Sequence, residues 1–257
     1  MTNDYEDFKG KILKITGLDL SSYKERQMKR RIDSLIKRHG HSTYDSFVLA
    51  ISKDKELFYE FMNYLTINVS EFYRNPGQWE ILEKDVIPEL LKHNKRPKVW
   101  SAACSTGEEP YSLAMLMSRF MDLSQVKILA SDIDDGVILK AKTGVYTAKS
   151  LVNLPKDFVD DYFTKVGENY EISQKIKNCV EFKKQNLLAD RYTDSVDLIV
   201  CRNVMIYFTE EAKSEMYTKF REALSPHGIL FVGSTEQIIM PNRFKLEPLK
   251  TFFYRRA

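Results

Sequence analysis

From about Lys98 onwards, short apolar segments alternate with helical patterns, and this alternation constrains the fold more than any other feature of the chain. The apolar segments are rich in Val and Ile, which is typical of buried strands. Strands that alternate with helices form a mainly parallel sheet covered on both faces, so the sequence predicts an α/β fold. The segments predicted as strands are KVWSAA (98–103), VKILASDI (126–133), VEFKKQN (180–186), VDLIVCRN (196–203) and GILFVGS (228–234).

Three other parts of the chain depart from this alternation. Residues 1–70 carry helical patterns without a clear strand pattern, which predicts a small N-terminal helical domain before an α/β domain over 71–257. A hairpin pattern around Gly167 predicts a small antiparallel β insertion at about 151–180. The segment FKLEPLKTFFYRR (244–256) is typical of two strands with a tight connection, so an antiparallel last strand is expected to close the sheet.

Composition excludes several classes of protein. The formal net charge of +3 over 257 residues is too small to indicate nucleic acid as a partner. No apolar run approaches the ~20 residues of a membrane-spanning helix, and the start MTNDYEDFKG lacks the features of a signal peptide. We therefore expect a cytoplasmic protein without membrane insertion. Cys104, Cys179 and Cys201 form neither a disulfide framework nor a CxxC motif, and no metal site is predicted.

The loop after the first predicted strand is short of glycine and rich in carboxylate. Ligands of open α/β sheets bind beyond the carboxyl ends of the strands, where this chain has STGEEPYS (105–112). A dinucleotide-binding loop has three glycines and this loop has only Gly107, so a phosphate cradle is not indicated. Glu108 and Glu109 would stabilise the positive start of the next helix without any ligand. Alternatively, one of them lies beside a cationic group of a ligand.

The residues at the end of the second predicted strand indicate a ligand that contains a nucleoside. An acidic residue there can bind a ribose diol through two acceptor oxygens, and Asp132 is best placed for this, followed by Asp134. Capping of the next helix explains Asp134 or Asp135 better than Asp132. S-adenosylmethionine matches both loops, because it joins an adenosine to positive charges and has no phosphate.

Two further strand ends carry weaker signals. Asn186 and Leu187 could contact the edge and face of an adenine, although asparagine is common in turns. Arg202, followed by Asn203, needs a partner at the end of a buried strand, either a nearby acid or an anionic ligand group. Tyr207 is either a core residue or a hydrogen-bond donor to a substrate.

Five motifs occur in an order that resembles the CheR family of chemotaxis receptor methyltransferases, over essentially the whole chain. The resemblance implies a Rossmann-like, class I S-adenosylmethionine-dependent fold. It also implies methylation of glutamate side chains on the cytoplasmic helices of chemoreceptors, which gives γ-methyl esters. STGEEPYS and CRNVMIYF are distinctive, whereas ASDID alone is not. The motifs are NVSEFYRNP (68–76), WSAACSTGEEPYSLA (100–114), ASDID (130–134), QNLL (185–188) and CRNVMIYF (201–208).

The resemblance also implies which residues act. It places Arg74 and Tyr207 nearest the reacting groups, and it favours Glu109 over Glu108 as a cofactor contact while leaving that choice open. A glutamate substrate has a pKa near ~4.3 and is ionised at neutral pH, so no strong general base is needed. The implied cofactor contacts are Asn68, Ser70, Arg74, Glu109, Asp132, Asn186, Leu187, Arg202 and Asn203.

The segment 23–39 is strongly basic, with seven Lys and Arg against Glu25 and Asp33. It is either a solvated helix face or a docking surface for the acidic helices of a chemoreceptor. The β insertion is a second potential receptor contact that the sequence leaves open. The docking candidates are Arg26, Arg30, Arg31, Lys37 and Arg38.

Other functions remain open from the residues alone. A class I methyltransferase acting on RNA or a small molecule would set the basic helix against phosphates, but that helix lacks interleaved aromatic residues. A non-catalytic, cofactor-binding adaptor would keep the fold without turnover. A monomer is expected, since neither a coiled coil nor a large apolar stripe is visible.

Overall fold

The computed structural model describes residues 2–257, and the chain divides into two compact units. The helical unit runs to Asn68 and includes residues 207–215, and the α/β unit comprises 69–206 and 216–257. The sequence-based boundary at residue 70 did not anticipate the returning segment. Backbone hydrogen bonds attach it, because Lys24 N donates to Tyr207 O at 2.9 Å and Thr209 N donates to Ser22 O at 2.9 Å.

The helical unit is built from amphipathic helices. In α2 the buried residues Met28, Ile32, Leu35 and Ile36 recur at helical spacing, so one face is apolar and the opposite face stays in solvent. Asp54 caps α4 by accepting hydrogen bonds from the backbone N–H groups of the first turn. The elements are α1 (Thr2–Thr16), η1 (Leu20–Ser22), α2 (Glu25–Arg38), α3 (Tyr44–Lys53) and α4 (Lys55–Thr66).

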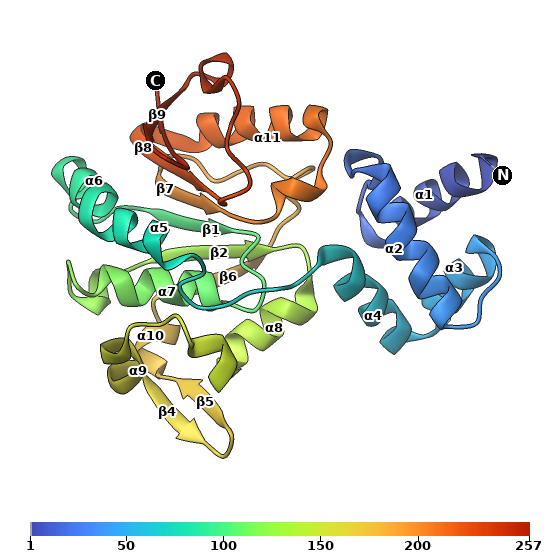
Figure 1. Cartoon of the computed structure of the whole chain (residues 1–257), viewed down its shortest axis with the longest axis horizontal. Helices are drawn as coiled ribbons and strands as arrows, with labels where there is room; N and C mark the ends of the chain where they lie inside the picture. The colour runs from blue at the N-terminus through green and yellow to red at the C-terminus, as the bar shows by residue number, and fades with distance from the viewer. Residues whose placement is uncertain (1) are drawn as a thin grey trace. The chain divides into compact units, whose positions relative to one another are not determined.

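The α/β unit contains a seven-stranded sheet in the order β6-β2-β1-β7-β8-β10-β9, which Figure 1 shows edge to edge. The pairs β6–β2, β2–β1, β1–β7 and β7–β8 are parallel, whereas β10 is antiparallel to both β8 and β9. The predicted mainly parallel sheet with an antiparallel closing hairpin is confirmed. The strands are β1 (Val99–Ala102), β2 (Ile128–Asp132), β6 (Val180–Lys184), β7 (Val196–Cys201), β8 (Leu224–Val232), β9 (Leu246–Lys250) and β10 (Phe253–Arg256).

Helices cover both faces of this sheet. Successive strand residues point to opposite sides, and all four residues of β1 are buried, so both sets of side chains pack against helices. Val99 of β1 belongs to a core with Trp79 of α5 and Leu116 of α7. The next residue, Trp100, instead packs against Phe220 of α11 with ring centroids 5.8 Å apart. The remaining elements are α5 (Pro76–Ile81), the π-helical η2 (Leu82–Val86), α6 (Ile87–His93), α7 (Glu108–Met117), η3 (Leu123–Gln125), α8 (Asp135–Thr143), η5 (Met205–Tyr207), α11 (Glu210–Ala223) and η6 (Pro241–Phe244).

A second, three-stranded antiparallel sheet forms the predicted insertion, in the order β3-β5-β4. It starts earlier than predicted, at Val145, because β3 has only three residues and too short an alternation to recognise in the sequence. Its central residue, Tyr146, turns inward against Phe72, with ring centroids 4.8 Å apart. The elements are β3 (Val145–Thr147), η4 (Ala148–Leu151), α9 (Lys156–Tyr162), β4 (Phe163–Val166), β5 (Asn169–Ile172) and α10 (Gln174–Lys177).

None of the helices formed by residues 2–257 has both the length and the apolar composition needed to cross a lipid bilayer.

Candidate functional site

Four loops meet at one edge of the large sheet, because β6, β2, β1 and β7 are neighbours and run parallel. Each loop follows the carboxyl end of its strand, which is where open α/β sheets bind ligands. The predicted residues Asn186, Asp132, Glu109 and Arg202 therefore come to the same edge from positions far apart in the sequence.

The loop after β1 is tightly constrained. Ala103 and Ser105 have positive φ angles of 62° and 49°, a conformation that residues other than glycine rarely adopt. Two hydrogen bonds hold the loop to β2: Cys104 N donates to Ser131 O at 2.9 Å, and Ser105 N donates to Asp132 Oδ2 at 2.8 Å. The carboxylate predicted to bind a ribose thus also shapes the neighbouring loop.

Gly107 serves packing rather than access to a phosphate. Its φ is +94°, and a Cβ atom there would lie 2.9 Å from Ala141 Cβ and 3.0 Å from the Tyr146 hydroxyl. These neighbours fill the side where a larger residue would project. The single glycine of the loop is explained by helix packing, which agrees with the absence of a phosphate cradle in the sequence.

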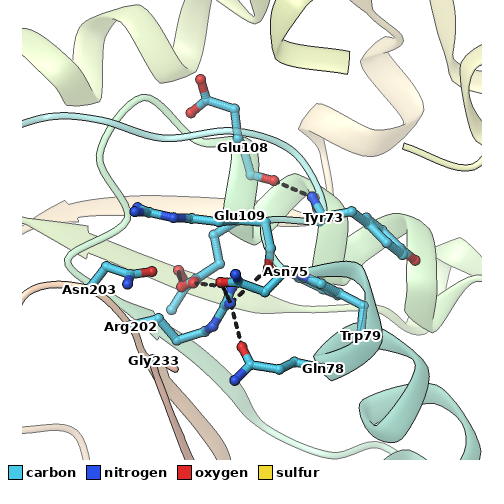
Figure 2. A network of polar contacts seen from close by, with 12 residues as sticks. Tyr73, Asn75, Gln78, Trp79, Glu108, Glu109, Arg202, Asn203 and Gly233 are labelled. Carbon is cyan, nitrogen blue, oxygen red and sulfur yellow. Dashed lines mark hydrogen bonds and ion pairs between the residues drawn. The ribbon is translucent and has the colours of Figure 1, made fainter. Parts of the chain in front are cut away.

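Glu109 lies in a buried polar cluster, shown in Figure 2. Its Oε1 accepts a hydrogen bond from Ser101 Oγ at 2.8 Å, and its Oε2 lies 3.8 Å from Arg202 Nη1. Burial raises the pKa of Glu109 to about 6, even though Arg202, Ser101 and Arg74 pull it down; the charge of Glu236 adds to the rise. The nearby cations therefore only partly compensate this carboxylate.

Glu108 has different surroundings. It is buried, and Thr106 Oγ1 donates to its Oε2 at 2.7 Å. Burial raises the pKa of Glu108, while hydrogen bonds from Thr106 and Ser70 act in the opposite direction. Ser70, one of the predicted cofactor contacts, is thus adjacent to Glu108 rather than to Glu109.

Arg202 is buried, and its guanidinium binds residues 74–78 to the end of β7. Its Nη2 donates to Arg74 O at 2.7 Å, to Asn75 Oδ1 at 3.1 Å and to Gln78 Oε1 at 2.7 Å. Figure 2 shows Asn75 and Gln78 beside Arg202. Its guanidinium also lies 4.8 Å from the centroid of the Phe231 ring. Of the two partners considered from the sequence, the nearby acid is present as Glu109. The shortest contacts of Arg202 go to Arg74 O, before α5, and to Gln78, within α5.

Asn75 and Gln78 were not predicted. They lie more than 120 residues from Arg202 in the sequence, and only the tertiary fold brings them to it. Burial lowers the pKa of the Arg202 guanidinium, and the charge of Glu109 opposes this change. The network fixes the backbone around Arg74, whose guanidinium donates to Val69 O at 3.2 Å.

Asp132 ends β2 and is also buried. Its Oδ1 accepts from Asp134 N at 3.1 Å, in addition to the bond from Ser105 N to Oδ2. Burial raises the pKa of Asp132 to about 6 despite these bonds. The backbone of Ile133 also contributes a hydrogen bond. A carboxylate offers about four acceptor positions, so Asp132 can accept a further hydrogen bond. Asp134 caps α8 through Gly136 N, as the helix-capping interpretation anticipated.

Asn186 and Leu187 form a turn after β6. Asn186 Oδ1 accepts from Leu188 N at 3.0 Å, and Asn186 N donates to Asp190 Oδ2 at 2.8 Å. Leu187 is buried, and its carbonyl accepts from Tyr192 and Lys219. The asparagine has the structural role of a turn residue, and its adenine contact stays a prediction.

Asn68 and Tyr207 belong to the helical unit. Asn68 Nδ2 donates to Thr66 Oγ1 at 2.8 Å and to Asn63 Oδ1 at 3.2 Å. Tyr207 is half-buried and lines a pocket of about 210 Å³ in that unit. The pocket is lined by Lys24, Gln27, Met28, Arg30, Arg31, Ile67 and Tyr207.

The five docking candidates fall into two groups. Arg31 donates to Tyr64 O and lies over the Tyr64 ring, and Arg38 lies 3.5 Å from Glu60. Arg26, Arg30 and Lys37 are exposed, and none of them forms an ion pair within residues 2–257. The second group lines a hollow of about 580 Å³ on the outer side of α2.

Glu236 is a buried residue of this region that the sequence reading missed. It follows β8, and its Oε2 accepts from Asn203 N at 2.6 Å. The signal in the sequence is an acidic residue four positions after Val232, the last residue of β8.

The donor set fits a cationic nucleoside cofactor. Asp132 is buried and Glu109 is partly buried, with 14% of its side-chain surface exposed. The raised pKa values of both carboxyl groups reflect negative charge that their surroundings compensate only in part and that a nearby cation would offset. Packing around Gly107 leaves no glycine-rich cradle for a phosphate. Within residues 2–257, no group of three or more His, Cys, Asp or Glu side chains is arranged to hold a metal ion.

Comparison with known proteins agrees with this geometry. Residues 68–253 match the SAM-binding domain of CheR methyltransferases, and residues 3–66 match their all-alpha domain. The chain is 43% identical over 255 residues to the chemotaxis protein methyltransferase of Listeria monocytogenes, covering 99% of this chain and 97% of that protein.

More distant relatives cover nearly as much of the chain. It is 33% identical over 245 residues to the chemotaxis protein methyltransferase of Escherichia coli K12, covering 90% of this chain and 83% of that protein. For the protein of that name from Borreliella burgdorferi, identity is 31% over 251 residues and coverage is 89% of each chain. These matches confirm the resemblance and the S-adenosylmethionine cofactor: the chain belongs to the CheR methyltransferase family, with the all-alpha domain followed by the S-adenosylmethionine-binding domain.

Proposed function

We propose that this protein transfers the methyl group of S-adenosylmethionine to glutamate side chains on the cytoplasmic helices of chemoreceptors, forming γ-glutamyl methyl esters. The observation that carries the proposal is the undercompensated carboxylate pair Glu109 and Asp132 at the carboxyl edge of the sheet. It occurs in a chain that matches proteins named chemotaxis protein methyltransferase over almost its full length.

We assign Glu109 to the cationic end of the cofactor and Asp132 to its ribose. Glu109 suits a cation better than Glu108. Two hydroxyls, of Thr106 and Ser70, bind the Glu108 carboxylate, whereas one hydroxyl, of Ser101, binds Glu109, whose Oε2 has Arg202 at 3.8 Å. Asp132 retains acceptor capacity beyond its three backbone hydrogen bonds. The other residues that we assign to cofactor binding are Asn68, Ser70, Arg74, Asn186, Leu187, Arg202 and Asn203.

When bound, S-adenosylmethionine supplies a methyl group on a positively charged sulfur, which a carboxylate oxygen of the substrate attacks. A glutamate side chain is ionised at neutral pH, with a pKa near ~4.3, so no residue of this protein has to remove a proton. The work of the protein is therefore to orient the carboxylate. We assign this role to Tyr207, whose ring lines the basic pocket of the helical unit, and to the guanidinium of Arg74.

We further propose that α2 of the helical unit docks the acidic receptor helices. Arg26, Arg30 and Lys37 are spaced by four and seven residues, so they share one face of the helix. Arg31 and Arg38 are engaged with Tyr64 and Glu60, which removes them from the proposed docking set.

The docking assignment can be tested with a matched pair of variants. Changing Arg26 and Arg30 to Glu should raise the KM for a receptor fragment about tenfold or more, because opposite charges steer the encounter. Cofactor affinity should stay unchanged. The control changes Lys53 and Lys55, exposed residues of the same unit, to Glu and alters the net charge equally. Equal KM values in both double variants would contradict docking through α2.

The methyl transfer itself is tested with labelled S-adenosylmethionine and purified cytoplasmic fragments of chemoreceptors. Base-labile label on glutamate is the expected result. Label on RNA or on a small molecule instead would identify a different methyltransferase, and cofactor binding without any transfer would identify an adaptor. Since the proposed substrates are cytoplasmic helices, we place the protein in that compartment. We propose that it acts as a monomer, which sedimentation of the purified chain would check.

A further inference from the structure

Glu236 is a buried carboxylate that binds the backbone of two neighbouring loops. Its side chain lies beyond β8, with 5% of the residue surface exposed. Oε2 accepts from Asn203 N at 2.6 Å and from Gly233 N at 2.9 Å, and Oε1 accepts from Ile206 N at 3.2 Å. A hydrogen bond from the backbone of Met205 adds to these. In the described part of the chain, Glu236 forms no ion pair, so its partners are backbone amides rather than a cation.

The loop that Glu236 binds is the one that carries the site residues of β7. Asn203 has a φ of +60°, a left-handed conformation that costs on the order of 1 kcal/mol unless its surroundings hold it. The amides of residues 203, 205 and 206 all converge on the same carboxylate. The loop therefore curls around Glu236 directly after Arg202.

Gly233 makes this arrangement possible. A Cβ atom at Gly233 would lie 2.4 Å from Glu236 Oε2 and 2.9 Å from Asn203 N, distances too short for any side chain. The glycine lets the carboxylate sit between the ends of β7 and β8. Its role concerns space rather than conformation, because its φ is not in the positive range.

We propose that Glu236 is a positioning residue for methyl transfer, whose carboxylate holds the 202–206 loop so that Arg202 and Asn203 are aimed at the cofactor. This inference rests on the cofactor contacts assigned under the proposed function. Burial lowers the pKa of the Arg202 guanidinium, and the charge of Glu236 opposes this change, as does that of Glu109.

We call the hydrogen bonds between the Glu236 carboxylate and the backbone N–H groups of the 202–206 loop the tether. Two variants disturb it in independent ways. Glu236→Gln keeps the shape but leaves an amide NH₂ facing backbone N–H groups, so at least one hydrogen bond is lost. Gly233→Ala keeps every charge and displaces the carboxylate by steric contact. Glu247→Gln is the control, because Glu247 is a partly exposed residue of β9 that pairs with Arg255.

We expect both tether variants to raise the Kd for S-adenosylhomocysteine roughly 10-fold to 100-fold, the effect of losing hydrogen bonds to a charged group. kcat should fall with it, while the receptor KM stays within about twofold, since α2 is not part of the tether. In hydrogen exchange, the amides of Asn203 and Ile206 should lose protection while those of β7 keep theirs. Glu247→Gln should match the wild type in every measurement.

The inference is overturned if the folded fraction of both tether variants keeps the wild-type Kd and kcat, because the carboxylate would then serve stability alone. If both variants fail to fold, the wild type decides: S-adenosylhomocysteine should increase the protection of the Asn203 and Ile206 amides, and unchanged protection overturns the inference. A wild type that binds the cofactor through this tether but methylates no receptor would refute the proposed function and leave this inference standing.

Discussion

Cofactor affinity should fall as the pH is lowered from 7 to 5, because the carboxyl groups of Glu109 and Asp132 titrate in this range. The pKa values of Glu109 and Asp132 are both raised to about 6, chiefly by burial. A cationic ligand favours the ionised form of a neighbouring carboxylate, so binding should lower both pKa values and release protons. Acidification then competes with the cofactor.

The size of the effect follows from the pKa values. At pH 5, a carboxyl group with a pKa of about 6 is protonated roughly ten times more often than it is ionised. If the bound state requires the ionised form, the Kd rises about tenfold for each group, or about 100-fold for both. This corresponds to about 1.4 kcal/mol for each group. At pH 6, where each group is half protonated, binding should release about one proton in total.

Isothermal titration calorimetry measures both quantities. The Kd for S-adenosylmethionine is determined at several pH values between 7 and 5, and the enthalpy at pH 6 is compared in two buffers with different ionisation enthalpies. In Glu109→Gln, which keeps the shape and removes one titrating group, proton release at pH 6 should drop to about half. The remaining pH dependence should be about tenfold rather than about 100-fold.

Acid unfolding does not explain the expected loss of affinity. The folded pKa of each group lies above its unfolded value of ~4, so the folded state binds more protons in this window. These two groups therefore make the protein more stable, by up to about 2 kcal/mol each, as the pH falls from about 6 towards 4. A Kd that stays constant from pH 7 to pH 5, with a binding enthalpy independent of the buffer, would refute the reasoning.

Two substitutions test the roles of single residues. Arg202→Met removes three hydrogen bonds and leaves Glu109 buried without its cation, so we expect a loss of about 3–5 kcal/mol and a Tm lower by about 10 °C, measured by calorimetric unfolding. An unchanged Tm would mean that Arg202 does not connect the segment before α5 to the sheet. Tyr207→Phe should lower kcat about tenfold and leave the Tm unchanged, since the side chain is half-buried at a pocket. Retained turnover would remove any need for the hydroxyl.

Much of the fold could be predicted because its signals are local. The central strands of the large sheet are buried runs such as Val196–Cys201, which is apolar except for Asp197, and these produce nearly continuous apolar segments in the sequence. The three-residue strand β3 gives no comparable signal, so the start of the insertion was misplaced. The sequence did not indicate that segment 207–215 belongs to the helical unit. The segment is attached by long-range backbone hydrogen bonds, and these leave no pattern in the side chains.

The candidate site could be predicted only where chain topology brings residues together. Parallel strands place their carboxyl ends at one edge, so Asp132, Glu109 and Arg202 could be grouped from the sequence. Asn75 and Gln78 reach Arg202 across more than 120 residues, and nothing in their local pattern indicates this. Likewise, the sequence did not distinguish Arg31 and Arg38 from the other docking candidates, because the groups that they contact lie on α4 rather than on their own helix.

Glu236 was not predicted from the sequence, because its side chain binds the backbone of a site loop. The side chains directly after each strand lie at the surface of the site, whereas Glu236, which binds the backbone of a site loop, lies four residues beyond β8. Here three non-glycine residues with φ in the left-handed range, Ala103, Ser105 and Asn203, lie in two of the site loops. In each loop a buried carboxylate accepts a backbone N–H, Asp132 from Ser105 and Glu236 from Asn203. The carboxylates of this site therefore have two roles. Their hydrogen bonds stabilise loops with strained backbone conformations, and their partly uncompensated negative charge favours the binding of a cationic cofactor.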